Sequence, residues 1–73
     1  MPEEPQHEAV VEFGQKLRSL REAAGISQEN FARLVEVDRS YYSGVERGVR
    51  NPTLLMLIRF AKALKRPVRD FFF

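Results

Sequence analysis

The 73-residue sequence predicts an all-α domain, a compact bundle of five short helices. Over four segments, apolar residues recur at spacings of three and four, as they do on the buried face of an amphipathic helix. Capping residues and glycines mark the segment ends, and no segment alternates apolar and polar residues like a half-buried strand. The chain contains no cysteine, so neither disulfide bonds nor a thiolate metal site stabilises its small core.

Residues 1–8 are acidic, contain two prolines and lack apolar periodicity, which predicts a disordered acidic tail before a folded domain over residues 9–73. Helical periodicity begins at about Glu8, and the first helix is expected to end at Gly25. Its apolar face consists of Val10, Phe13, Leu17, Leu20 and Ala24. His7 has no second nitrogen or sulfur ligand near it in the sequence, so we expect no metal site.

Two short helices with a tight turn between them form the centre of the sequence. Ser27 can cap the first helix, whose apolar face consists of Phe31, Leu34 and Val35. Asp38 can cap the second helix, over residues 39–47, and Gly48 can end it. Because the connection is so short, the pair is predicted to form a helix-turn-helix. The groups outside the apolar stripe of the second helix are small, hydroxylic or basic and suit the edge of a nucleic acid: Arg39, Ser40, Tyr41, Ser43, Gly44 and Arg47.

The C-terminal part of the chain predicts two further helices. Thr53 can cap a helix over residues 54–64 that follows a loop containing Pro52. Its broad apolar face consists of Leu54, Leu57, Ile58, Phe60, Ala61 and Leu64. Pro67 ends this helix, and residues 68–73 can form one last short turn.

The formal charge of +2 is distributed unevenly along the chain. The first twelve residues carry four glutamates and neither lysine nor arginine, whereas the remaining 61 carry twelve lysines and arginines and six acidic residues. A basic domain behind an acidic tail fits a nucleic-acid partner, although an ordinary solvated surface has the same charges. No apolar run approaches the length needed to span a membrane and no signal peptide is apparent, so we expect a cytoplasmic protein without a membrane partner.

Six blocks, taken together and in order, resemble the lambda/434 repressor-like (Cro/C1, XRE) helix-turn-helix family. They are Leu-Arg-Ser-Leu-Arg at 17–21, Ile-Ser-Gln-Glu at 26–29, Phe-Ala at 31–32, Ser-Gly-Val-Glu-Arg-Gly at 43–48, Arg-Asn-Pro-Thr at 50–53 and Ala-Lys-Ala-Leu at 61–64. The resemblance extends over about residues 13–72. It implies a sequence-specific regulator of transcription that binds double-stranded DNA, with its recognition helix over residues 39–47 in the major groove.

The resemblance also implies roles for individual residues. It implies that three residues contact the bases: Arg39, Ser40 and Ser43. It implies that five others contact the DNA backbone: Gln28, Tyr41, Arg47, Arg50 and Asn51. Plain capping by Gln28 and simple exposure of Tyr41 are the alternatives for those two side chains. For Arg47, Arg50 and Asn51 the alternative is an ordinary solvated surface group. Arg21 and Glu46 match a structural ion pair of the family.

Four positions depart from the family pattern, among them Leu55 and Met56, which replace polar residues at the start of the fourth helix. Tyr42 stands where isoleucine or valine is usual, so its hydroxyl must find a partner. Lys65 replaces the usual glycine after the fourth helix, which implies a strained cap.

Apolar residues in excess of what a small monomer needs predict a homodimer that reads a (pseudo)palindromic operator. The candidates for its interface are Leu55, Met56, Phe71, Phe72 and Phe73. Alternatively, Phe71 and Phe72 only close the core. A stand-alone regulator of this size is similar to the controller proteins of restriction–modification systems, while phage-type repressors, antitoxin components and excised domains remain alternatives.

Other function classes are less well supported by the residues. With no thiol, one histidine and no glycine-rich phosphate loop, the sequence indicates neither an enzyme nor a cofactor or small-molecule site. A protein-interaction, coactivator or antitoxin-type module with the same fold is the alternative to a DNA-reading regulator.

Overall fold

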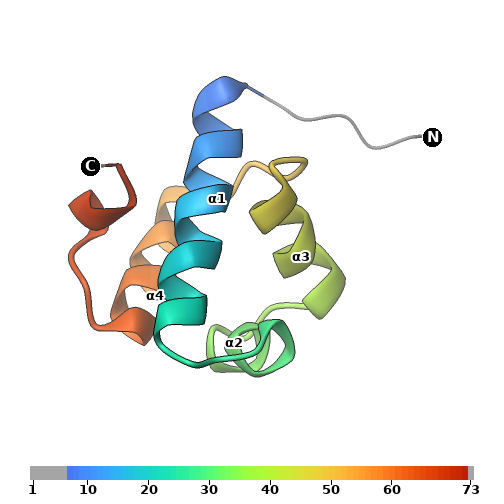
Figure 1. Ribbon diagram of the computed structural model, residues 1–73. Coiled ribbons are helices and arrows are strands. Elements are labelled where there is room, and N and C mark those ends of the chain that lie inside the picture. The colour runs from blue at the N-terminus through green and yellow to red at the C-terminus, as the bar shows by residue number, and fades with distance from the viewer. Residues whose placement is uncertain (1–6, 73) are drawn as a thin grey trace.

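The computed structural model describes residues 7–72, which form four α-helices and one 3-10 helix (Figure 1). These are α1 (Glu8–Ala23), α2 (Gln28–Leu34), α3 (Arg39–Arg47), α4 (Leu54–Leu64) and η1 (Val68–Phe71). Residues 7–72 contain no strand, so the all-α prediction is confirmed. The predicted fifth helix is only a four-residue 3-10 turn, which follows Pro67.

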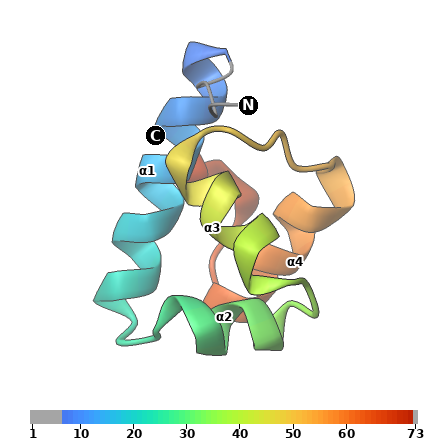
Figure 2. The same ribbon diagram turned by 90° about the vertical axis from the view of Figure 1, so that its right-hand side faces the viewer.

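The helices surround one core. In Figure 1, α3 and α4 lie on different sides of α1, and α2 lies across the lower end of the bundle. Turned by 90°, the molecule presents α3 at the front with α2 beneath it (Figure 2). α1 and α2 both pack against α3, while η1 packs against α1 and α4. One side of α3 is therefore packed against α1 and α2, and its other side faces solvent.

An aromatic cluster fills the core. Phe31 and Tyr42 are fully buried, with ring centroids 5.2 Å apart, and the Tyr42 ring meets Phe60 edge-on at 5.8 Å. Phe13 of α1 meets Phe71 of η1 at 5.1 Å, also edge-on. Phe13 also stacks on Phe60 at 6.3 Å, so that these contacts join all five elements. Such pairs contribute about 0.5–1.5 kcal/mol beyond the area they bury.

Two glycines allow α1 and α3 to approach closely. A Cβ atom at Gly14 would lie 2.4 Å from the carbonyl oxygen of Val45 and 2.6 Å from that of Glu46. Gly48, which ends α3 with φ of 79°, lies against Val11, and a Cβ there would come within 2.8 Å of the Val11 Cγ2 atom. The sequence identified Gly48 as a helix end, but the role of Gly14 was missed. A glycine inside an apolar helical pattern was the available signal.

Side-chain caps begin all four α-helices. The Oγ of Ser27, the carboxylate of Asp38 and the Oγ1 of Thr53 accept from backbone N–H groups of α2, α3 and α4, as predicted. α1 begins at Glu8, inside the segment expected to be a tail. His7 caps it, since His7 Nδ1 accepts from the Ala9 N–H at 3.0 Å. The remainder of the predicted tail, residues 1–6, lies outside the described residues.

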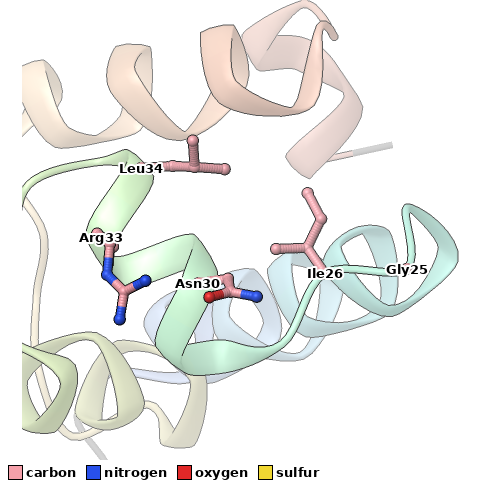
Figure 3. Close-up of a pocket in the computed structure, with 5 residues that line it drawn as sticks. All are labelled: Gly25, Ile26, Asn30, Arg33 and Leu34. Carbon is pink, nitrogen blue, oxygen red and sulfur yellow. The ribbon is translucent and has the colours of Figure 1, made fainter.

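Two leucines assigned to buried faces are exposed, so those predictions were wrong. Leu34, 60% exposed, is the last residue of α2 and faces a hollow beside Ile26 rather than the core (Figure 3). Leu54, 69% exposed, is the first residue of α4 and precedes the turn that packs inward.

Left-handed backbone occurs at two residues other than glycine. Lys65 has φ of 56° and ends α4, so the expected departure from an ordinary cap is confirmed. Glu36, with φ of 60°, forms the turn between α2 and α3.

Candidate nucleic-acid interface

The exposed side of α3 gathers the predicted base-reading residues. Arg39, Ser40 and Ser43 line one open hollow of about 410 Å³, together with Asp38 and Arg47. Their spacing along one helix places them on neighbouring positions of the same surface. Arg47, assigned to the DNA backbone from the sequence, thus belongs to the same surface as the base-reading candidates. Asp38 was recognised only as a cap.

Hydrogen bonds within α3 hold the two serine hydroxyls of this surface. The Asp38 carboxylate accepts from the backbone N–H and the hydroxyl of Ser40 and from the N–H of Tyr41. The Ser40 hydroxyl and then the two N–H groups lower the pKa of Asp38, which keeps this carboxylate ionised. Ser43 Oγ accepts from Arg47 Nη1 at 2.5 Å. The Arg39 side chain, in contrast, has no hydrogen bond or ion pair with any other described residue and is free to reach a ligand.

The opposite side of α3 carries a buried ion pair. Arg21 Nε donates to Glu46 Oε2 at 2.6 Å and Arg21 Nη2 donates to Oε1 at 3.2 Å. The two side chains are only 8% and 2% exposed. The remaining donor group, Arg21 Nη1, is bound to the Ile26 carbonyl at 2.7 Å. The pair therefore connects α1, the loop before α2, and the last turn of α3.

Two further side chains complete this buried network. The Tyr42 hydroxyl donates to Glu46 Oε2 at 2.5 Å, which supplies the partner that its burial requires. Gln28 Nε2 donates to Glu46 Oε1 at 2.9 Å. The Gln28 amide nitrogen is therefore directed into the protein, while a contact of this half-buried side chain with the DNA backbone stays a prediction. No buried side-chain nitrogen or oxygen in residues 7–72 lacks a hydrogen-bond partner.

The network shifts the pKa values of its members. Burial alone raises the pKa of Glu46, but hydrogen bonds from Arg21, Tyr42 and Gln28 outweigh it and hold the pKa below its ordinary value. The bond to Glu46 raises the pKa of Arg21 against the effect of burial. Burial and then the bond to Glu46 raise the pKa of the Tyr42 hydroxyl. All three shifts maintain an ionised pair beside a neutral tyrosine.

The remaining DNA-backbone candidates occupy different environments. Arg50 and Asn51 are exposed in the loop after α3. Tyr41 is half-buried and packs against the core, so its ring is partly structural. Gly44, which the sequence placed with the exposed groups, is buried because the Arg50 side chain covers it.

The candidates for a dimer interface separate into buried and exposed residues. Phe71 is 2% exposed and packs on Phe13, so its assignment to an interface was wrong and the alternative of closing the core applies. Met56 is half-buried against the core. Leu55 and Phe72 are 71% and 54% exposed. Leu54, which had been assigned to the core, is also exposed and precedes Leu55 in the sequence. Phe73 lies outside the described residues.

No arrangement suited to metal binding occurs in the part of the chain that the structure describes. Residues 7–72 contain no group of three histidine, cysteine, aspartate or glutamate side chains close enough to hold an ion. None of the helices formed by these residues is both long and apolar enough to cross a membrane.

A helix-turn-helix whose second helix presents arginine and serine to solvent is typical of a DNA-binding protein. The comparisons agree. The helix-turn-helix family model HTH_3 matches residues 17–71, and the chain belongs to this family, of the Cro/C1 (XRE) type. It is a DNA-binding regulator of transcription.

Individual relatives refine the comparison. The chain is 40% identical over 63 residues to the control protein C.MunI of a Mycoplasma species, covering 85% of each chain. The crystal structure of the restriction–modification controller protein C.AhdI from Aeromonas hydrophila superimposes with a TM-score of 0.87 at 48% identity, covering 90% of this chain and 100% of that one. SinR, a master regulator of biofilm formation solved in complex with DNA, gives a TM-score of 0.76 at 28% identity and covers 81% and 95%.

Proposed function

We propose that this protein is the controller of a restriction–modification system and binds a (pseudo)palindromic operator as a homodimer, with α3 in the major groove. The single observation that carries the DNA-reading part is the hollow on α3, where Arg39 stands without an intramolecular partner beside two serine hydroxyls. Similarity to C.MunI and C.AhdI supports the controller role. The proposal retains the cytoplasmic location expected from the sequence, since its partner is DNA.

In this proposal Arg39 supplies most of the direct readout. A guanidinium can donate two hydrogen bonds to O6 and N7 of guanine, a contact worth about 1–3 kcal/mol of discrimination. Ser40 and Ser43 exchange their internal hydrogen bonds for base edges. Arg47 then releases Ser43 and, with Tyr41, Arg50 and Asn51, contacts phosphates. Contacts of this kind set the register of the protein on the duplex.

The proposed dimer uses the exposed apolar residues near the start of α4 and the end of η1. Leu54, Leu55 and Phe72 are each more than half exposed. Phe72 also stacks on Phe13 at 6.0 Å and borders a small apolar hollow of about 140 Å³, so an incoming side chain has a place to bind. A two-fold interface repeats the same patch on both subunits.

Selection of bound duplexes from a random pool tests the DNA part of the proposal. We expect an enriched site with two inverted half-sites whose centres are about one helical turn apart. Failure to enrich any sequence at low salt would refute the reading role.

Sedimentation tests the dimer. The wild-type protein is expected to be dimeric at tens of micromolar, and the double substitution of Leu54 and Leu55 by serine to be monomeric. Leu34→Ser is the matched control, because Leu34 is 60% exposed but lies outside this patch. A monomeric wild type would refute the interface.

A protein-interaction module is the second candidate, and Leu34 is the observation that favours it. This side chain borders two open hollows, one also lined by Ile26 and the other by Ala63. A side chain of a protein partner can bind in either hollow. Binding of DNA separates the two functions, because an interaction or antitoxin-type module need not select a sequence. We do not assign catalysis to the chain, since its relatives are regulators.

A further inference from the structure

Gly44 lies in the middle of the recognition helix, where a glycine weakens helix formation relative to alanine. The glycine follows Ser40 by four residues and so borders the exposed surface of α3. It is nevertheless buried. A Cβ atom at this position would lie 2.6 Å from Cγ of Arg50 and 3.6 Å from its Nε. The Arg50 side chain therefore occupies the space that any other residue at position 44 would need.

The backbone of Gly44 holds the same loop from a second direction. Its carbonyl oxygen accepts hydrogen bonds from the N–H groups of Val49 at 3.0 Å and Arg50 at 3.3 Å. Gly48, in the left-handed conformation, makes the sharp turn that brings these donors back to the helix. Arg50 is thus attached to α3 at its backbone and rests on α3 with its aliphatic stem.

We infer that Gly44 is a positioning residue for DNA binding: it seats Arg50 against the recognition helix and so directs the guanidinium to a DNA phosphate beside the major groove. This inference rests on the DNA-reading function proposed above. An arginine that is already placed loses less side-chain freedom on binding than a mobile surface arginine does. The helix-weakening glycine is then explained by DNA binding.

Comparison with Gly14 shows why position 44 can be tested without unfolding the protein. A Cβ at Gly14 would meet backbone carbonyl atoms, which cannot move without separating α1 from α3. At Gly44 the nearest obstacle is a flexible side chain on the surface. Alanine at position 44 is therefore accommodated by displacement of Arg50, and the fold remains.

The experiment is a double-mutant cycle with Gly44→Ala, Arg50→Ala and the combined variant, measured on a duplex selected by the wild type. Arg18→Ala is the matched control, since Arg18 is an exposed arginine of α1 that pairs with Glu22. Affinities are recorded over a range of salt concentrations. Losing one phosphate contact is expected to reduce the slope of log K against log salt by about 0.9.

We expect Gly44→Ala to melt at or above the wild-type temperature and yet to bind DNA more weakly, with the same smaller slope as Arg50→Ala. The combined variant should bind like Arg50→Ala alone. Relaxation of the Arg50 Nε–H group by NMR, without DNA, should show greater mobility in Gly44→Ala.

Three outcomes would overturn the inference. They are wild-type affinity in Gly44→Ala, additive losses in the combined variant, and unchanged Arg50 mobility. If the wild type selects no duplex, the proposed function fails first, while the NMR measurement still tests whether Gly44 seats Arg50.

Discussion

The two sides of α3 carry similar chemistry and have opposite roles. On the buried side, Arg21 and Glu46 form an ion pair less than one-tenth exposed, and no buried side-chain nitrogen or oxygen among the described residues lacks a hydrogen-bond partner. On the exposed side, the Arg39 side chain has no hydrogen bond or ion pair among the described residues, and the Ser43 hydroxyl accepts from Arg47. An arginine thus orients the helix where water is excluded, and we predict that an arginine recognises DNA where water has access. The predictions below test this contrast, from the largest expected effect to the smallest.

Removing the carboxylate from the buried side should have the largest effect. Glu46→Ala leaves Arg21 buried without a counter-ion and Tyr42 without an acceptor. Breaking such a pair costs about 3–5 kcal/mol, which is most of the stability of a small domain. Chemical denaturation measures this loss. Arg18→Ala, which breaks an exposed pair, is the control and should cost at most about 1 kcal/mol.

Separating the two helices that share the ion pair should have the next largest effect. In Gly14→Ala the new methyl group meets the carbonyl oxygens of Val45 and Glu46. Overpacking of this kind costs about 1–3 kcal/mol. Thermal denaturation should show the loss, and a variant as stable as the wild type would contradict the close approach of α1 and α3.

On the exposed side, a substitution should change recognition and leave stability unaltered. Arg39→Ala is expected to change the free energy of unfolding by less than about 0.5 kcal/mol. It should remove about 1–3 kcal/mol of preference for one base pair of the operator. Duplex selection with the variant measures this as a relaxed position, whereas uniform weakening over all sequences would assign Arg39 to the phosphates.

A change of pH should lower the stability that the buried network contributes more gradually than mutation does. Because the folded-state pKa of Glu46 lies below its ordinary value of 4.5, its contribution is complete above that pH and is lost as the pH falls through the folded pKa. The raised pKa of Tyr42 has the opposite sense, so its contribution is complete below pH 10 and is lost at higher pH. Urea midpoints recorded from acid to alkaline pH test both directions. Glu46→Gln, where it folds, should remove the acid limb attributable to this carboxyl.

The smallest change is expected in the turn that joins α2 to α3. Glu36 has φ of 60°, a conformation that costs a residue with a Cβ about 1–2 kcal/mol. Glu36→Gly relieves this strain, but the gain is offset by about 0.4–1 kcal/mol because glycine has more freedom in the unfolded chain. We expect a slightly higher melting temperature and unchanged DNA binding. A clear loss of stability would show that the Glu36 side chain makes a contribution of its own.

Much of this architecture was predictable from short stretches of sequence. Ser27, Asp38 and Thr53 mark helix starts, because a capping oxygen acts within three residues of its own position. Arg39, Ser40 and Ser43 could be grouped on one surface, since helical spacing alone places them together. Leu34 and Leu54 were assigned wrongly because both lie at helix ends, where periodicity does not reveal which neighbour covers a side chain.

Local sequence was therefore sufficient for the helices, their caps and the chemical character of the recognition surface, because all of these depend on residues a few positions apart. Only the packed structure decided which groups meet across the bundle. It placed Gln28 on Glu46, Phe71 in the core, Gly14 of α1 against α3 and Arg50 over Gly44. These contacts depend on how whole helices cross, and burial and excluded volume act between residues that no short sequence pattern connects.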